Sequence, residues 1–241
     1  MKCDPRPFEK ERGLLPELPR IQHLPYKPNT DRDDLVATEA EARVIFDGAI
    51  AEEKIDGSQV GILFDGNGEP IIRNKNHVLR KGYGCKGTPA KDQYAPLFNW
   101  TYAHRDEFAA LAFAMDMRVA VYGEWLYAEH TICYDLAPDD FIAHGLRDVD
   151  AGRHVATLRA RAALAEAGFS LPVLLATEVA SYERLTALTL MPAAWSTRDQ
   201  REGVVVKVDD GEWVTHLFKM RRATFKSRED FNVTPLRRRG R

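Results

Sequence analysis

Two predicted β-hairpins constrain the fold of this chain more than any other feature. Residues 50–74 follow a hairpin pattern, in which the apolar run 60–64 leads through Asp65-Gly66-Asn67-Gly68 into a second apolar segment. Residues 203–208 and 213–220 flank Asp210-Gly211 in the same way. Asn-Gly and Asp-Gly pairs supply the backbone conformations that tight hairpin turns need. Because hairpins join antiparallel strands, the sequence predicts mainly antiparallel sheets.

Helical patterns are fewer and are scattered among the strands. A short helix is expected to begin at Thr38, because Thr38 and Glu41 fit a capping box. Residues 119–127 and 141–146 are expected to be buried strands, and residues 75–100, with several glycines, a loop. The longer expected helices cover residues 105–117, 153–167 and 179–188. This irregular alternation favours an α+β fold, mainly antiparallel sheets with flanking helices, over a doubly wound parallel sheet.

Length and charge limit the classes of protein that fit. With 241 residues, 44% of them hydrophobic, the chain suits one large domain or two small ones. We expect an extended, proline-rich N-terminal strap over residues 1–30, one domain over residues 31–228, and a basic C-terminal tail over residues 229–241. The net charge of −2 gives the whole protein no strong signature of nucleic-acid binding, so any basic surface must be local.

The few cysteines and the composition of the N-terminus favour the reducing cytoplasm as the protein's compartment. Cys3, Cys85 and Cys133 are too few and too scattered for a disulfide framework or a zinc site. The N-terminus lacks the apolar core of a signal peptide, and no apolar run is long enough to span a bilayer. We therefore expect a soluble cytoplasmic protein with no membrane partner.

Two charged residues lie where burial is expected. Lys54 stands at the start of an apolar run, in Lys54-Ile55-Asp56-Gly57, and Glu124 lies inside the aromatic strand VAVYGEWLYAEH. Burying a charge is costly unless it is paired or contacts a ligand. Either Glu124 is a structural acid paired to a nearby base, or it contacts a ligand.

The second hairpin predicts a charged cluster. If Asp210-Gly211 is a two-residue turn, Glu202 lies opposite Lys219 and Arg221 points to the same face. Unless a bulge intervenes, Lys207 then faces elsewhere. The simplest interpretation is a cross-strand salt bridge worth about 0.2–1 kcal/mol on a sheet surface. A functional cluster becomes the better interpretation when Lys54 and Glu124 are considered with it.

Together, these segments resemble the covalent nucleotidyltransferase superfamily, which contains polynucleotide ligases and mRNA capping enzymes. Lys54-Ile55-Asp56-Gly57 matches its Lys-x-Asp-Gly nucleophile motif, and Tyr122-Gly123-Glu124 resembles the third motif. Glu202-Gly203-Val204-Val205-Val206-Lys207 resembles the fourth motif, and Phe218-Lys219-Met220-Arg221 the fifth. The four motifs occur in the family's order, and the resemblance covers about residues 20–228.

Within that superfamily, the sequence is most similar to compact ATP-dependent RNA ligases. The segments that carry this similarity are Ile21-Gln22-His23-Leu24-Pro25 and Gly123-Glu124-Trp125-Leu126-Tyr127-Ala128. DNA ligases and capping enzymes carry an OB-fold after the fifth motif, whereas only about twenty residues follow Arg221 here. The resemblance therefore implies an ATP-grasp-like ligase adenylation domain without a C-terminal OB-fold.

The resemblance also implies a reaction. The Lys54 amine would attack the α-phosphorus of ATP, giving lysyl-AMP and pyrophosphate; AMP would pass to an RNA 5′-phosphate, and a 3′-hydroxyl would displace it. A lysine must be neutral to attack, yet its free pKa is about 10.4. Burial beside Lys219, Arg221 and a bound Mg²⁺ is therefore expected to lower the pKa of Lys54.

The roles of the other motif residues follow from the resemblance. Glu124 would accept hydrogen bonds from the ribose hydroxyls. Glu202 would hold Mg²⁺ or Mn²⁺, which prefer oxygen ligands. Lys219 and Arg221 would contact the α-phosphate and stabilise charge in the transition state.

Further residues are expected to bind the nucleotide. Asp56 and Gly57 belong to the nucleophile motif. Arg73 matches the family's phosphate-contacting arginine, with Arg80 as a competitor. Glu53 either touches adenine or is a solvated charge.

Two departures from the family pattern bear on the steps that follow formation of lysyl-AMP, in which the strands are joined. Gln59 stands where the RNA ligase branch usually has asparagine, and His144-Gly145 replaces a Phe-Asp pair whose aromatic ring stacks on adenine. An imidazole can also stack on a base, but Gly145 supplies no carboxylate. Phe141 and Asp148 are the alternative stacking and acidic groups.

The sequence leaves three functions open. The first is an ATP-dependent RNA ligase that acts on RNA ends or a nicked RNA duplex, with ends healed by a separate kinase-phosphatase. The second is a degenerate homologue that binds nucleotide or RNA without sealing, motivated by His144-Gly145. The third is a DNA nick-sealing or capping nucleotidyltransferase. The basic residues 237–241 are either a solvated end or a grip on backbone phosphates.

Overall fold

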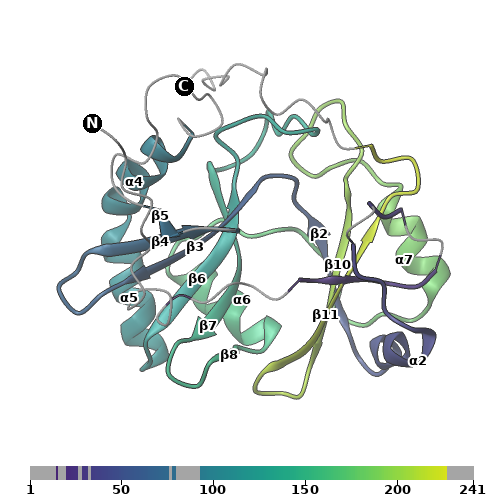
Figure 1. The fold of residues 1–241 in the computed structure, drawn as a ribbon, viewed down its shortest axis with the longest axis horizontal. Helices are drawn as coiled ribbons and strands as arrows, with labels where there is room; N and C mark the ends of the chain where they lie inside the picture. Colours follow the sequence, from purple (N-terminus) through teal and green to yellow (C-terminus); the bar gives the residue numbers. More distant parts are fainter. Residues whose placement is uncertain are drawn as a thin grey trace.

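The computed structural model describes residues 15, 20–26, 29–31, 34–75, 78–79 and 93–226, which form two β-sheets with flanking helices (Figure 1). One sheet has five strands in the order β1-β11-β10-β2-β9, and the other has six in the order β5-β4-β3-β6-β7-β8. The pairs are antiparallel except for β1 and β11, which run parallel. The predicted α+β fold with mainly antiparallel sheets is confirmed.

The elements have the following bounds. The five-stranded sheet contains β1 (Gln22–His23), β2 (Ile50–Lys54), β9 (Leu174–Ala176), β10 (Gly203–Asp209) and β11 (Val214–Arg221). The six-stranded sheet contains β3 (Ser58–Phe64), β4 (Pro70–Asn74), β5 (Val78–Leu79), β6 (Val119–Trp125), β7 (Phe141–Asp148) and β8 (Arg153–His154). The helices are α2 (Glu39–Ala42), continued by the 3₁₀ turn η1 (Arg43–Phe46), then α4 (Tyr94–Ala103), α5 (Arg105–Met115), α6 (Thr157–Glu166) and α7 (Tyr182–Thr189).

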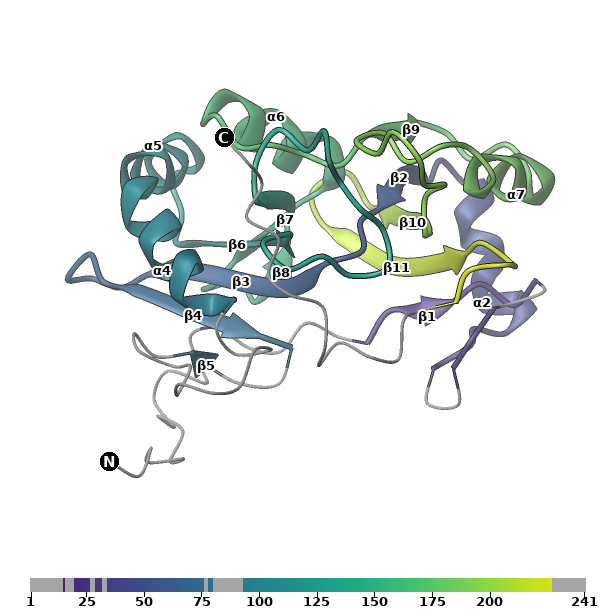
Figure 2. The same ribbon diagram turned by 90° about the horizontal axis from the view of Figure 1, so that it is seen from above.

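The six-stranded sheet buries one face against three helices (Figure 2). Ile62 and Val121 belong to a core that also contains Leu97 of α4, Phe108 of α5 and Leu164 of α6. Because successive side chains of a strand point to opposite faces, Gln59 and Glu124 lie on the other face. That face is turned toward the five-stranded sheet.

The five-stranded sheet also packs one face against helices and turns the other face toward the second sheet. Val204, Val206 and Phe218 pack with Ile45 of η1 and Leu185 of α7 on the outer face. The alternate residues therefore point inward, toward the six-stranded sheet. These inward residues include Glu52, Lys54, Val205, Lys207 and Lys219.

The nucleophile segment crosses from one sheet to the other. The predicted hairpin is confirmed for β3 and β4, but β2 pairs with β10 in the five-stranded sheet, so residues 50–74 are not one hairpin. The chain passes between the sheets at residues 55–57. A Cβ on Gly57 would lie 2.7 Å from the Leu126 side chain and 3.1 Å from the Trp125 carbonyl oxygen. Glycine is therefore required where the chain crosses.

Some helix boundaries differ from the sequence prediction. Residues 94–103 form α4 although we predicted a loop there, because burial of Leu97 and Phe98 stabilises a helix that has no side-chain N-cap. Helix α6 begins at Thr157 instead of residue 153, since residues 153–154 pair with β7. The capping box of Thr38 and Glu41 is confirmed.

The ends of the chain are described only in part. The expected N-terminal strap contributes β1, which lies beside β11, and the expected basic tail lies outside the described residues. None of the described helices has the length and apolar character needed to cross a bilayer.

Candidate active site

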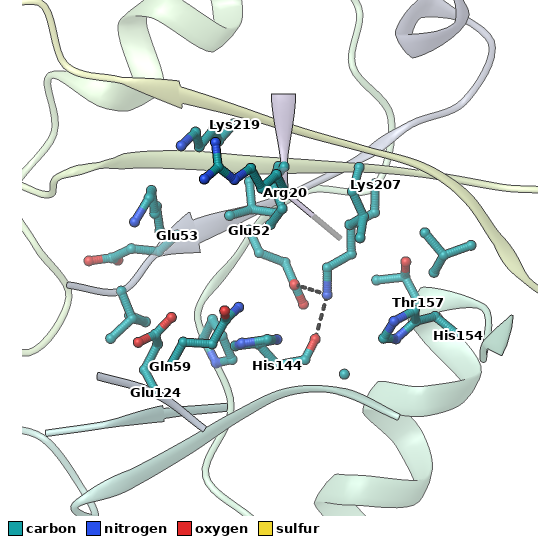
Figure 3. A pocket seen from close by; sticks show the side chains of 18 of the residues that line it. Arg20, Glu52, Glu53, Gln59, Glu124, His144, His154, Thr157, Lys207 and Lys219 are labelled. Carbon is teal, nitrogen blue, oxygen red and sulfur yellow. Dashed lines mark hydrogen bonds and ion pairs between the residues drawn. The ribbon is translucent and has the colours of Figure 1, made fainter. Parts of the chain in front are cut away.

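A cavity of about 520 Å³ lies between the two sheets (Figure 3). The five-stranded sheet lines it with Glu52, Lys54, Val205, Lys207 and Lys219. The six-stranded sheet lines it with Gln59, Glu124, His144, Gly145 and His154. The N-terminal segment adds Arg20, Asp31 and Asp34. The lining is therefore rich in both cations and carboxylates.

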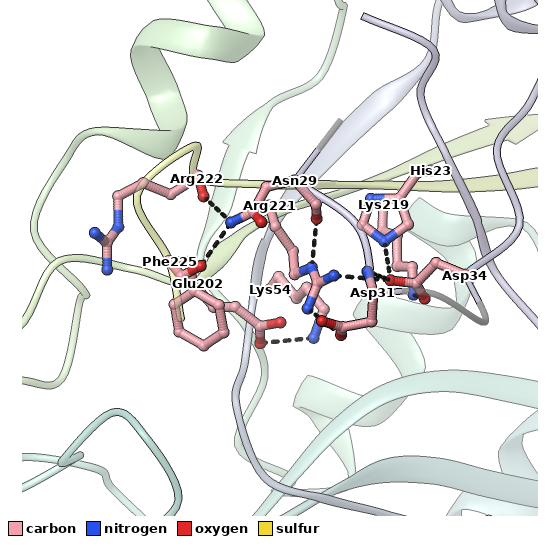
Figure 4. Close-up of polar contacts among 10 residues, drawn as sticks. All are labelled: His23, Asn29, Asp31, Asp34, Lys54, Glu202, Lys219, Arg221, Arg222 and Phe225. Atoms are coloured by element: carbon pink, nitrogen blue, oxygen red, sulfur yellow. Dashed lines mark hydrogen bonds and ion pairs between the residues drawn. The ribbon is translucent and has the colours of Figure 1, made fainter. Parts of the chain in front are cut away.

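Lys54 is ion-paired inside this cavity. Its Nζ lies 2.6 Å from Oε2 of Glu202, a residue that is 5% exposed (Figure 4). Gly203 pairs with Lys54, so the residue before β10 lies beside the end of β2. Burial opposes the charge on Lys54, but the carboxylates of Glu202 and Glu124 outweigh it and raise the pKa of Lys54. The expected lowering of the pKa of Lys54 relied on nearby cations that include Mg²⁺, whereas the protein's own carboxylates act in the opposite direction.

Glu124 is a buried acid with an unused oxygen. Burial raises its pKa to about 8, with the Lys54 ammonium acting in the opposite direction. Within the described part of the chain, its Oε2 atom is buried and has no hydrogen-bond partner. Gln59 lies opposite it on β3. A carboxyl group in this setting suits a ligand that offers hydrogen-bond donors.

The predicted register of the second hairpin is wrong. Val205, not Glu202, lies opposite Lys219, and Gly203 lies opposite Arg221. The connection contains four residues, 210–213, and the register shifts next to Asp209, because the Asp210 carboxylate accepts hydrogen bonds from two backbone amides in the turn. Lys207 therefore faces the cavity, which the prediction allowed only where a bulge intervenes.

A second charged pair, Glu52 and Lys207, also lines the cavity. Lys207 Nζ lies 2.6 Å from Oε2 of Glu52 and donates to the His144 carbonyl oxygen at 2.5 Å (Figure 3). Arg161 of α6 donates to the other Glu52 oxygen and, at 2.9 Å, to the Pro172 carbonyl. Glu52 was not predicted as a site residue, although its position two residues before Lys54 on a strand places both on one face.

Glu53 points away from this face. Its carboxylate accepts hydrogen bonds from the Ala194 amide at 3.2 and 3.3 Å and lies 3.8 Å from Arg201, although the residue borders the cavity. At 1% exposure it is not the solvated charge of the alternative interpretation. Burial raises its pKa.

Asp56 holds the loop that covers the crossing segment. Its Oδ2 atom accepts hydrogen bonds from the amides of Thr131 at 2.8 Å and Ile132 at 3.1 Å. The Asp56 amide donates to the Tyr134 hydroxyl at 2.9 Å. These contacts fix the chain just after Lys54.

The two cations of the fifth motif contact acids of the N-terminal segment (Figure 4). Lys219 Nζ lies 2.8 Å from Asp34, and the Arg221 guanidinium lies 2.8 Å from Asp31 and 2.7 Å from Asp34. Arg221 is 8% exposed and lies behind the cavity lining. Lys219 borders the cavity.

Arg73 is placed differently from the sequence expectation. It lies opposite Gly61 on the inner face of the six-stranded sheet, but outside the cavity lining. It donates to the Leu15 carbonyl at 2.7 Å and to the Asn74 carbonyl at 3.2 Å. Its competitor Arg80 falls outside the described residues.

His144 and Gly145 sit at an irregularity between β6 and β7. Tyr122 pairs with Gly145 whereas Gly123 pairs with Ala143, so His144 is the extra residue. Burial lowers the pKa of His144 to about 3, which leaves a neutral imidazole at the cavity wall. A Cβ on Gly145 would meet nothing within 4 Å.

Neither alternative to this pair reaches the cavity lining. Phe141 is 1% exposed and belongs to the helix-facing core. Asp148 accepts hydrogen bonds from the amides of Asp150 and Ala151 in the following turn.

Lys54, Glu124 and Lys219 thus line one cavity between two mainly antiparallel sheets, as expected from the resemblance to the covalent nucleotidyltransferase superfamily. A family model described as RNA ligase matches residues 48–228, and the chain therefore belongs to the RNA ligase family. A search of curated protein sequences found no match.

Solved structures of the Naegleria gruberi RNA ligase share the fold. A variant with ATP and Mn superposes with a TM-score of 0.55 at 17% identity, covering 75% of this chain and 51% of that one. A variant with AMP and Mn gives 0.55 at 18%, covering 76% and 52%. An apo variant gives 0.58 at 17%, covering 92% and 62%. The chain thus spans less than two thirds of the length of each of these proteins.

Proposed function

We propose that the protein is an ATP-dependent RNA ligase in which Lys54 carries AMP. The observation that carries this proposal is that Lys54 lines a cavity together with Glu124 and Lys219 and is ion-paired there with the buried Glu202. Family membership and the ATP and AMP complexes of the Naegleria gruberi enzyme support it.

In the first step, Lys54 Nζ attacks the α-phosphorus of ATP. The N–P bond forms, the bond from that phosphorus to the bridging oxygen breaks, and pyrophosphate leaves with the electron pair. Lys54 must first lose its contact with Glu202 and release a proton to solvent, to which its side chain is 22% exposed, because the ion pair holds it as an ammonium. Lys219, at the cavity wall, faces the charge that develops on the α-phosphate.

Glu202 fits the role of metal ligand. Its carboxylate is buried, and burial raises its pKa. A divalent cation beside it would therefore stabilise the ionised form. Among the described residues, no group of three or more His, Cys, Asp or Glu side chains could hold a metal. Mg²⁺ commonly binds one or two carboxylates together with substrate phosphates. Held by Glu202 and the phosphates, Mg²⁺ or Mn²⁺ would neutralise phosphate charge.

The cavity offers separate regions for ribose and base. The unpartnered Glu124 oxygen suits the ribose hydroxyls, and the neutral His144 ring suits stacking on adenine. Glu52 and Lys207 supply polar groups beyond His144. We assign Glu53, Asp56 and Gly57 to shaping the nucleotide site around Lys54. Arg73 and Arg221 support it from behind the cavity lining.

In the later steps, AMP passes from Lys54 to the 5′-phosphate of an RNA end, and a 3′-hydroxyl displaces AMP to form the phosphodiester. The substrate would be RNA ends or a nicked RNA duplex. A separate kinase-phosphatase would supply the 5′-phosphate and the 3′-hydroxyl. We propose that this RNA repair takes place in the cytoplasm.

Mass spectrometry tests the first step. After incubation with ATP and Mg²⁺, we expect one AMP on the peptide spanning residues 53–60. Lys54→Ala should take none, and Lys226→Ala, which changes an exposed lysine, should be labelled like the wild type. Equal labelling of the Lys54→Ala variant would show that the assignment is wrong.

A sealing assay separates the proposed ligase from a homologue that only binds. Gly145 favours the second candidate, because it leaves the cavity wall without the family's carboxylate. A ligase closes a nicked RNA duplex, whereas a binder leaves it open. Replacing RNA by DNA in the same assay tests DNA sealing, and comparing GTP with ATP in label transfer to the protein tests capping.

A further inference from the structure

The N-terminal segment builds one wall of the cavity next to the fifth motif. His23 of β1 pairs with Lys219 of β11, and the chain then returns beside β1. The His23 amide donates to the Leu35 carbonyl at 2.7 Å, and the Ala37 amide donates to the His23 carbonyl at 2.9 Å. This double contact places Asp34 beside Lys219.

Four donors converge on the Asp34 carboxylate. Lys219 Nζ donates to Oδ1 at 2.8 Å. Arg221, His23 Nε2 and the Asp31 amide approach Oδ2 at 2.7, 3.1 and 2.9 Å. Because three donors contact Oδ2, the orientation of the carboxylate is fixed. Its Oδ1 atom therefore also fixes the position of the Lys219 ammonium.

The charge states fit this arrangement. Burial opposes ionisation of Asp34, but hydrogen bonds from Lys219 and the Asp31 amide outweigh it and hold the pKa of Asp34 well below its usual range. Burial, helped by the Lys219 charge, lowers the pKa of His23 to about 4, so its ring is neutral. Since a carboxylate only accepts, His23 Nε2 carries the proton and donates.

Lys219 and Arg221 differ in how many of their donors the protein uses. Arg221 donates to Asn29 O, Asp31 and Asp34, which anchors the N-terminal segment. In the described part of the chain, Lys219 contacts Asp34 alone. An ammonium has three N–H donors, so two remain for a phosphate in the cavity.

We propose that Asp34 is a positioning residue for self-adenylylation, which fixes the Lys219 ammonium at the cavity wall where the α-phosphate of ATP must lie. This inference rests on the proposed function. Asp34 could instead inhibit ATP binding by occupying Lys219. In that case ATP would have to displace the Asp34 carboxylate from Lys219. Its three contacts at Oδ2 oppose that movement.

Single-turnover transfer of label from α-labelled ATP to the protein tests the role of Asp34. The variants are Asp34→Asn, Lys219→Gln and the double variant, with rates followed over hours at several ATP concentrations. Asp150→Asn is the matched control, because Asp150 forms an exposed ion pair with Arg118 at 2.6 Å, remote from the cavity lining.

For Asp34→Asn, we expect the rate at saturating ATP to fall by between about 10- and 100-fold, as for other misplaced catalytic groups. Asp150→Asn should label like the wild type. In the Lys219→Gln background, Asp34→Asn should cause no further loss, because its effect acts through Lys219.

Two results would overturn the positioning role. One is an Asp34→Asn rate equal to or above that of the wild type. The other is an equal loss in the Lys219→Gln background, which indicates a general structural defect. Should Asp34→Asn not fold, Asp34→Glu takes its place with the same expectations. If the wild type takes no label at all, the proposed function fails instead.

Discussion

Lys207 Nζ lies 2.6 Å from Glu52 Oε2, and both side chains lie on the face of the five-stranded sheet that carries Lys54. Glu52 and Lys207 are 1% and 6% exposed. Lys207 also donates to the His144 carbonyl in the other sheet, so this pair joins the two walls of the cavity. The polar contact between the two walls of the cavity thus depends on one buried lysine.

Replacing Lys207 by methionine should destabilise the protein. The substitution leaves the buried Glu52 carboxylate with Arg161 as its remaining cation. Breaking a buried pair typically costs about 3–5 kcal/mol, and the contact with Arg161 should keep the loss near the lower limit. Urea unfolding measures it. Glu52→Gln combined with Lys207→Met should recover part of the loss, and a double variant no more stable than Lys207→Met would contradict this account.

Glu202→Gln should strongly slow formation of lysyl-AMP while leaving the fold intact. The substitution keeps the size of the side chain but removes the carboxylate that pairs with Lys54 and would hold the metal. Loss of such a group commonly lowers rates by about 10²–10³-fold. Label transfer from ATP, titrated with Mn²⁺, measures the effect. The exposed Glu178→Gln is the control, and wild-type labelling of Glu202→Gln would refute the assignment.

The sequence predicted the class of fold and much of the site, because both depend on local patterns. Hairpin turns and capping residues are read within a few positions. The charged residues Lys54 and Glu124 stood out within apolar strands, and in the structure both line one cavity, where Lys54 pairs with Glu202.

The parts that were not predicted depend on distant contacts or on one uncertain turn. The connection at Asp210 is longer than a two-residue turn, and this difference reversed the assignment of Lys207 and separated Glu202 from Lys219. Asp34 and Lys219 are 185 positions apart, and no local pattern links them.

Two cavity-side glycines should respond differently to alanine. A Cβ on Gly203 would lie 2.0 Å from the Met220 carbonyl oxygen, so β10 and β11 would have to separate. A Cβ on Gly145 would meet nothing within 4 Å. We expect Gly203→Ala to lower the thermal midpoint by many degrees or prevent folding, and Gly145→Ala to leave it nearly unchanged. Similar midpoints for the two variants would contradict the close approach of β10 to β11 at Gly203.

The partly buried His154 should make stability depend on pH. Burial lowers the pKa of His154 to about 4, against an ordinary value of 6.5. Below pH 6.5 the unfolded chain therefore takes up a proton that the folded protein refuses, and stability present above that pH is lost as the pH falls toward 4. Glu124, whose pKa burial raises to about 8, acts in the opposite direction, so the effect must be measured as a difference between variants.

His154→Gln removes this penalty. Relative to the wild type, its free energy of unfolding should rise by about 1–2 kcal/mol between pH 7 and pH 5, because one pKa unit corresponds to about 1.4 kcal/mol. Urea unfolding at both pH values gives the difference. The exposed His216→Gln should show no such change. An unchanged difference for His154→Gln would mean that His154 takes up its proton as readily in the folded protein as in the unfolded chain.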